Sequence, residues 1–416
     1  MRREGDDLAR AAAETVARRS YGKLVAFLAA RGGDVARAED ALSEAFAAAL
    51  GEWPGSGVPA NPEAWLLVVA RRKTIDLARR RRHGDDLAPH LRLLADELEA
   101  AASAGGIPDE RLRLMFACAH PALDPGIRAP LILQTVLGFD AATIASAFLI
   151  APPAMGQRLV RAKTKIRQAG IPFRLPEPDE LRERLDAVLE AIYAIFTEGW
   201  ADPAGAEARR RNLAEEGVWL GRLVASLLPD EPEALGLVAL MLHAEARRGA
   251  RRDASGDYVP LAEQDPTLWN AALIDEAEDL LRRASTLGVI GRYQLEAAVQ
   301  SAHVVRRTTG RADWTAVERL YAALAAMTGS PVVAVNRAVA IAETRGAAAG
   351  LAALDALAGD KRLLDYQPYW AARAELLART ADPAADIAYQ RAIGLESDPA
   401  VRRFLQRRWE ALFAKP

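Results

Sequence analysis

Apolar residues recur at three- and four-residue spacing along almost the whole of this 416-residue chain, and alternating strand-like runs are nearly absent. Such spacing gives each segment one apolar face at helical period, and it leaves little that could pair into a sheet. We therefore predict an all-α fold. A chain of this length exceeds one compact core of ordinary size, so we expect two or three domains.

Interruptions of the helical pattern set the predicted domain boundaries. The first block, residues 1–82, is followed by a weakly apolar stretch with glycines and acidic residues, 83–106, which we interpret as a linker. A second block covers residues 107–175. Prolines at 172, 176 and 178 remove backbone donors and force extended neighbours, so a third part is expected to cover residues 176–416.

Composition narrows the class of protein. With 51% hydrophobic and 26% charged residues, the chain falls in the soluble globular range. A single cysteine, Cys118, excludes an internal disulfide framework and fits a reducing compartment. The sequence has no apolar run of about 18 residues and no signal-peptide core near its start. We therefore expect a cytoplasmic protein without a membrane segment.

Charge is distributed unevenly about Leu175. Residues 1–175 hold 25 basic and 20 acidic residues, a net charge of +5, and the remainder holds 29 and 36, a net charge of −7. A basic front suggests a polyanionic partner, whereas the acidic remainder suggests a protein-facing or autoregulatory role.

The second block contains a helix-turn-helix pattern. Asp140 can cap a helix over 141–148, residues 149–151 form a tight turn, and Pro152-Pro153 open a longer helix. Met155, Leu159, Ala162 and Ile166 are expected to face inward. The opposite side is expected to expose Gln157, Arg158, Arg161, Lys163, Lys165 and Arg167. Such a helix can enter the major groove of DNA, although an ordinary solvated basic face is the competing interpretation. Before it, Pro130 should kink or shorten its helix.

The first block places an acidic helix, an irregular loop and a basic helix in series. The acidic helix, 34–50, carries Glu39, Asp40, Glu44 and Phe46, and the predicted loop covers 51–61. The basic helix follows from Pro62, and it carries seven cations and one carboxylate between Arg71 and Arg82. That many cations suffice for several phosphate contacts and a strong salt dependence.

The segments AED…SEAF and NPEAWLLVVARRKTIDLARRR, followed by the helix-turn-helix, resemble regions 2 and 4 of extracytoplasmic-function sigma factors. Later segments resemble the branch of that family with a C-terminal tetratricopeptide-like extension: RLRLMFACAHPAL, QRLVRAKTKIRQAGIPFRLP and SLLPDEPEALGLVALMLHAEAR. The resemblance implies a sigma region 2 helical bundle, a region 4 helix-turn-helix domain and a helical-repeat domain. It implies an alternative sigma factor that directs core RNA polymerase to promoters.

The resemblance also implies roles for individual residues. The acidic helix would dock on the clamp of the largest subunit of core RNA polymerase, whose β and β′ subunits are the expected partners, through Glu39, Asp40, Glu44 and Phe46. The loop and the basic helix would capture and open −10 promoter DNA through Trp53, Asn61, Trp65, Arg71, Arg72, Lys73, Arg79 and Arg80. The helix after Pro153 would read the −35 element through Gln157, Arg158, Arg161, Lys163 and Lys165.

The extension repeats itself weakly. Asn336, Ala338 and Ala340 align with Trp370, Ala372 and Ala374 at an offset of 34 residues, the period of tetratricopeptide helix pairs. A protein or ligand partner of this part is expected from the resemblance. Arg306, Arg307, Arg311 and Asn336 could serve a groove, but we favour a solvated face. Tyr366, Tyr369 and Trp370 are better explained by packing between helices than by a recognition patch.

The sequence offers no sign of an enzyme. It lacks a glycine-rich phosphate loop, a nucleophile elbow and a histidine-rich metal motif, and Cys118 with His120 supplies too few ligands for structural zinc. We therefore expect no catalytic residue, metal or cofactor. Two alternatives stay open: a helix-turn-helix transcription regulator with a ligand- or protein-binding helical-repeat domain, and a scaffold whose basic faces bind acidic proteins.

Overall fold

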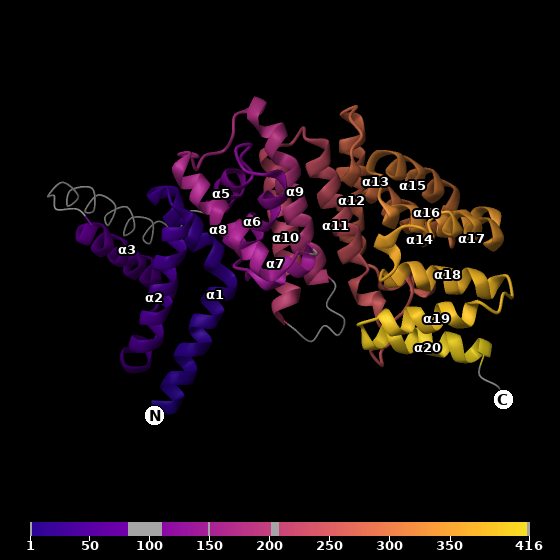
Figure 1. Ribbon diagram of the computed structural model, residues 1–416, viewed down its shortest axis with the longest axis horizontal. Coiled ribbons are helices and arrows are strands. Elements are labelled where there is room, and N and C mark those ends of the chain that lie inside the picture. The colour runs from indigo at the N-terminus through magenta and orange to yellow at the C-terminus, as the bar shows by residue number, and fades with distance from the viewer. Residues whose placement is uncertain (1, 82–109, 149, 201–207, 414–416) are drawn as a thin grey trace. The chain divides into compact units, whose positions relative to one another are not determined.

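The computed structural model describes residues 2–81, 110–148, 150–200 and 208–413, and helices make up the fold of these ranges (Figure 1). The prediction of an all-α fold is confirmed. Within the described ranges there is no β-strand, and one isolated bridge joins Arg252 and Tyr258. The chain divides into two compact units, Met1–Ala191 and Ile192–Pro416, and the division falls inside helix α9 (Pro178–Trp200). The expected linker, 83–106, lies outside the described residues.

The first unit is a group of packed helices. In chain order they are α1 (Arg2–Gly32), α2 (Val35–Ser56), α3 (Pro62–Arg81), α5 (Arg111–Cys118), α6 (Pro125–Leu137), α7 (Ala141–Ala147), α8 (Pro152–Gln168) and the first part of α9. The predicted helix-turn-helix is present as α7 and α8, which pack against each other. Four of these helices begin at a side chain that accepts a backbone N–H, and in α6 this side chain is Asp124, which accepts from Gly126 at 2.9 Å. Asp34 accepts from Arg37 at 3.2 Å, Asn61 from Ala64 at 3.1 Å and Asp140 from Thr143 at 2.9 Å.

Helices α1 and α6 meet at a glycine. Gly22 lies so close to Val136 that an added Cβ would stand 1.6 Å from the Val136 carbonyl oxygen. Gly138, which ends α6 with a φ of 68°, is covered by the ring of Tyr21. Because no larger residue fits at position 22, glycine there permits a direct backbone contact between α1 and α6.

Pro130 was expected to kink or shorten its helix, and the expectation of a shorter helix is wrong. Helix α6 continues through Pro130 for another seven residues to Leu137. Pro130 lies in the second turn, so it removes a single backbone hydrogen bond, the one to the carbonyl of Gly126. Leu131, Ile132 and Leu133 after it are buried, and this packing outweighs the missing bond.

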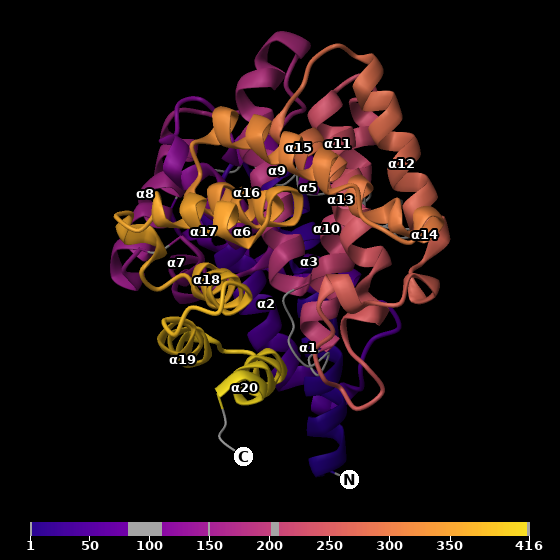
Figure 2. The ribbon, with the colours of Figure 1, turned by 90° about the vertical axis from the view of Figure 1, so that its right-hand side faces the viewer.

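The second unit is a succession of helices in which each packs mainly on its neighbours in the chain (Figure 2). After the second part of α9 they are α10 (Ala208–Leu227), α11 (Pro232–Ala246), α12 (Ala271–Thr286), α13 (Arg292–Val304), α14 (Arg306–Thr309), α15 (Trp314–Thr328), α16 (Pro331–Arg345), α17 (Ala347–Asp355), α18 (Gln367–Arg379), α19 (Ala385–Leu395) and α20 (Pro399–Phe413). Short 3₁₀ turns are η1 (Arg248–Arg251), η2 (Leu261–Glu263), η3 (Pro266–Leu268) and η4 (Lys361–Leu363).

Three of the four aligned alanines of the extension are completely buried, and Ala372 is half-buried. The buried three are Ala338 and Ala340 in α16 and Ala374 in α18, where a small side chain lets neighbouring helices approach. Tyr369 is buried beside Trp370, and their rings meet edge to face at 5.3 Å, so helix packing explains both, as predicted.

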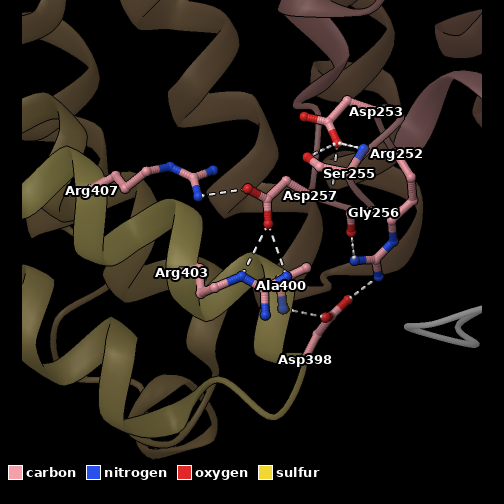
Figure 3. A network of polar contacts seen from close by, with 9 residues as sticks. All are labelled: Arg252, Asp253, Ser255, Gly256, Asp257, Asp398, Ala400, Arg403 and Arg407. Carbon is pink, nitrogen blue, oxygen red and sulfur yellow. Dashed lines mark hydrogen bonds and ion pairs between the residues drawn. The ribbon is translucent and has the colours of Figure 1, made fainter.

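The loop that follows η1 is fastened to the last helix (Figure 3). Asp257 accepts hydrogen bonds from Arg403 at 2.8 Å and from Arg407 at 2.8 Å, and both arginines belong to α20. Arg252 pairs with Asp398, just before α20, at 2.6 Å. This fastened loop joins parts of the chain that are about 146 residues apart.

Candidate nucleic-acid interface

The inward face of α8 is the one predicted. Met155, Leu159, Ala162 and Ile166 are all buried, and α8 thereby packs on α7, α6 and α2. Because the buried positions recur every three or four residues, the positions between them point away from the helical core. The sequence from Ala151 to Ala169 contains no acidic residue, so that outer face is wholly neutral or basic.

Three predicted DNA-contacting residues form one row on the outer face of α8. Gln157, Arg161 and Lys165 are exposed and stand one helical turn apart. Arg158 lies at the edge of this row, half-buried, with its Nη2 atom 3.5 Å from the Asp124 carboxylate. A row with this spacing can follow a groove: an amide and guanidinium groups can hydrogen-bond base edges, and an ammonium can contact phosphate.

The expectation of an exposed Lys163 is wrong. Its Nζ atom lies 2.6 Å from Glu39 Oε2 in α2, and both side chains are 13% exposed. Arg167, expected on the same face, lies 3.5 Å from the carboxylate of Asp34, which is 5% exposed. Both residues lie on the flank of α8 that faces α2, and α2 brings two carboxylates to that flank. In this arrangement Lys163 contacts a protein carboxylate instead of presenting its charge to solvent.

The predicted polymerase-binding residues of α2 are divided between two environments. Glu39 faces α8, and burial raises the pKa of its carboxyl while Lys163 opposes that rise. Asp40 and Glu44 are exposed, and Phe46 is half-buried. The accessible acidic surface of α2 is therefore formed by Asp40 and Glu44, with Phe46 beside them.

The predicted loop at 51–61 is shorter in the structure, and Trp53 is not part of it. Helix α2 continues to Ser56, and Trp53 is a helical residue that is 2% exposed. Its ring meets that of Trp65 edge to face at 5.4 Å, which fixes α2 against α3. Sequence reasoning missed this because Gly51 and Pro54 are typical of loops, and the burial of Trp53 overrides their effect on the helix. The ring of Trp53 is not accessible to a base in this arrangement.

The remaining −10 residues lie on or before α3. Asn61 is exposed and its side chain caps α3, so its amide is engaged with the backbone. Arg71 is half-buried and Arg72 is exposed. Lys73 is exposed and lies 3.6 Å from Glu44. Arg79 and Arg80 belong to α3, but their side chains lie outside the described residues.

Three further features of the described part of the chain concern metal binding, thiol chemistry and membrane insertion. No group of three or more metal-ligating side chains occurs there. Cys118 is completely buried, and burial raises the pKa of its thiol to about 12. Among the helices that the structure describes, none is sufficiently long and apolar for a transmembrane span.

Sequence comparison adds family information to this geometry. A family model described as sigma-70 region 2 matches residues 16–84, and one described as a family of unknown function, DUF6596, matches residues 184–285. A protein of Rhizobium meliloti (strain 1021), described as uncharacterized, is 37% identical over 386 residues, which cover 91% of this chain and 90% of that protein. No solved structure matches the chain. The first match covers α2 and α3, whereas α7 and α8 lie outside both family matches.

Proposed function

We propose that the chain is an alternative sigma factor of the extracytoplasmic-function type. It belongs to one family with the Rhizobium meliloti protein, and the match of residues 16–84 to sigma-70 region 2 supports a sigma-70 factor. Region 2 of this family binds core RNA polymerase and the −10 promoter element, so core polymerase and promoter DNA are its partners in general. The chain acts in promoter recognition and transcription initiation rather than in catalysis.

The observation that carries the subtype is the second DNA-binding element. Helix α8 follows a short helix and a turn, and it presents Gln157, Arg161 and Lys165 in one exposed row. An extracytoplasmic-function factor needs such an element for −35 DNA in addition to region 2 for −10 DNA. We assign Arg158 to the edge of that surface, and Lys163 contributes there only when its contact with Glu39 opens.

The −10 surface is proposed on α3 and the turn before it. Arg72 and Lys73 are exposed cations suited to the backbone of a melted strand, and Asn61 and Trp65 flank the same turn. Arg71, Arg79 and Arg80 are assigned to this surface by their place on α3. Asp40, Glu44 and Phe46 are assigned to polymerase docking, with Glu39 joining them when α2 is released from α8.

The second unit is proposed to be a tetratricopeptide-like domain that binds a protein or a ligand. Its support is the succession of paired helices and the buried alanines of α16 and α18, 34 residues apart in sequence. Extended stacks of this kind offer one large surface built from many helices, and recognition is their common use.

A run-off transcription assay tests the proposed function. The purified full chain is added to core RNA polymerase with promoter DNA upstream of genes that depend on it. We expect transcripts with one defined start site that require both the chain and core. Binding of an operator without core, and no transcript with core, would instead identify a helix-turn-helix regulator. Absence of both core binding and specific DNA binding would reject both functions.

A variant of α8 tests the −35 assignment. Arg161→Ala should weaken promoter binding by the chain–core complex and reduce the slope of affinity against salt by about one unit, because one cation is lost. Arg113→Ala is the matched control, since Arg113 is an exposed arginine on α5 that pairs with Glu110 at 3.0 Å. Equal effects of the two substitutions would refute the role of Arg161.

A further inference from the structure

A cavity of about 310 Å³ opens in the second unit, between the segment 261–269 and the turn that joins α13 to α15. Its volume lies at the lower end of the range for small-molecule sites, about 300–1,000 Å³. The residues around it that matter for recognition are Leu261, Trp269, His303, Arg306, Arg311 and Trp314.

Aromatic rings form the walls of this cavity. Trp269 is 4% exposed, and the rings of His303 and Trp314 meet edge to face at 5.2 Å. Burial, together with Arg247, lowers the pKa of His303 to about 4, so its ring is neutral at pH 7. Flat, uncharged walls of this kind favour a flat apolar group between them.

Two arginines line the cavity, Arg306 and Arg311, and they make different contacts. Arg306 donates to the carbonyl oxygens of Leu261 at 2.7 Å and Gln264 at 2.8 Å, and it thereby holds the 261–269 segment against α14. The expectation of a solvated face is therefore wrong for Arg306. Arg311 is exposed at the cavity, and its guanidinium makes no ion pair within the described residues.

Two carboxylates of the segments around the cavity, Asp265 in the 261–269 segment and Asp313 two residues after Arg311, each accept a backbone N–H group. Asp265 accepts from Thr267 at 2.9 Å, and Asp313 accepts from Ala316 at 2.9 Å. Neither carboxylate pairs with Arg311, so the positive charge of Arg311 is available to an anion.

Trp269 adds a polar atom that lacks a partner. Its Nε1 atom is buried and has no hydrogen-bond acceptor within the described residues. A buried donor without an acceptor costs about 1–3 kcal/mol, and native proteins rarely leave one. The ring that carries this atom lines the cavity, so a molecule bound there would change the surroundings of the indole.

We propose that the cavity binds a small aromatic carboxylate. The ring of the molecule lies between the aromatic walls, and its carboxylate meets the Arg311 guanidinium. A neutral aromatic molecule lacks a group for Arg311, and an aliphatic acid lacks the flat surface that Trp314 and His303 accommodate. This site belongs to the second unit, and it does not depend on the sigma function proposed above.

Calorimetric titration of the full-length chain tests the site without polymerase or DNA. The probes are benzoate, salicylate, indole-3-acetate and 2-naphthoate, each compared with its neutral amide. We expect at least one acid to bind with a Kd below about 1 mM, and its amide to bind at least about tenfold more weakly. Arg311→Ala should weaken that acid about tenfold or more. Arg307→Ala is the matched control, because Arg307 is the neighbouring arginine that faces Asp275 at 4.0 Å.

A second measurement follows the Trp269 indole directly. In the chain with ¹⁵N-labelled tryptophan, the indole N–H resonance that disappears in Trp269→Phe should move when the acid binds. The proposal is overturned if none of the four acids binds at 1 mM, if acid and amide bind equally, or if Arg311→Ala and Arg307→Ala have equal effects. Each of these results leaves the transcription assay unaffected, so failure here is distinguishable from failure of the sigma function.

Discussion

Trp53 and Trp65 stand on either side of the same turn, yet their surroundings differ. Trp53 is 2% exposed, whereas Trp65 is half-buried at the start of α3. A buried indole contributes to stability through the large apolar area that it removes from water. The half-exposed ring of Trp65 is the one of the two that a DNA base can reach without unpacking α2 from α3.

Trp53→Ala should therefore lower the free energy of unfolding of the first unit by about 3–5 kcal/mol, as is usual for a large buried aromatic side chain. Urea denaturation of the full chain measures this effect. Leu50→Ala, an exposed position of the same helix, serves as control and should change stability little. Unchanged stability of Trp53→Ala together with impaired promoter opening would show that Trp53 acts on DNA after all.

His243 in α11 is another side chain whose behaviour is set by burial. It is completely buried, and burial together with Arg247 lowers its pKa to about 4. Glu278 lies 3.4 Å from its Nε2 atom, but this carboxylate is too exposed to outweigh the desolvation of the ring. His243 is therefore neutral in the folded chain at pH 7.

Acid should destabilise the second unit through His243. An unfolded histidine takes up a proton near pH 6.5 and the folded one near pH 4, so the unfolded state binds more protons between these values. The free energy of unfolding should fall by about 3 kcal/mol as pH decreases through that window. Urea denaturation at pH 7, 6, 5 and 4.5 measures the slope. His303 has a similarly lowered pKa of about 4, so His243→Leu should remove only the share of the slope that belongs to His243, and an identical slope in the variant would contradict the assignment.

At the scale of elements, the contact between α2 and α8 has the clearest functional meaning. Glu39 and Lys163 form a close pair with both side chains largely buried, and Asp34 and Arg167 form a second, longer one. Helix α2 carries the proposed polymerase-binding surface and α8 the proposed −35 surface. Each helix thus engages charged side chains of the other.

A charge swap tests the Glu39–Lys163 pair. Glu39→Lys leaves Lys163 facing a like charge, and breaking a buried pair in this way should lower the free energy of unfolding by about 3–5 kcal/mol. The double variant Glu39→Lys with Lys163→Glu should recover most of that loss, as a double-mutant cycle in urea measures. Asp40→Lys, one residue along on the exposed face, should change stability by less than about 0.5 kcal/mol. Additive effects of the two single substitutions would show that the pair is not coupled.

The same contact shows what the sequence can and cannot predict. Periodicity identified Met155, Leu159, Ala162 and Ile166 as the buried face of α8, because burial recurs with the helical turn. The periodicity of apolar residues could not show that α2 packs beside the flank with Lys163. It indicates which side of a helix is buried, but it does not indicate which other element buries that side. Lys163 was therefore expected to be exposed. The cavity beside Trp269 was missed for a related reason, since its walls come from segments that only the fold brings together.

At the scale of the molecule, each compact unit contains a contact that ties distant parts of the sequence. In the first unit it is the approach of Gly22 to Val136, and in the second it is the fastened loop, where Asp257 meets Arg403 and Arg407. A stack of helical repeats without such a tie responds to change mainly between nearest neighbours. The fastened loop instead couples the region after α11 to the final helix.

Asp257→Asn tests that coupling. Loss of the carboxylate charge should speed hydrogen exchange both in the loop at 252–260 and in α20, because the two segments hold each other. Exchange followed by mass spectrometry on the full chain resolves both segments. Asp360→Asn is the control, since Asp360 pairs with Arg362 only two residues away and should affect its own turn alone. Faster exchange confined to the loop would mean that α20 is held by its other contacts.

The pairing of α8 with α2 also affects the affinity of the free chain for non-specific chromosomal DNA. Genomic DNA attracts any protein in proportion to the cations that it can exchange for bound salt ions, and this attraction ignores sequence. Lys163 is held by Glu39 and is largely buried, so α8 offers bulk DNA one fewer such exchange than its composition suggests. If the proposed function holds, this pairing lowers the non-specific affinity of the free chain for chromosomal DNA.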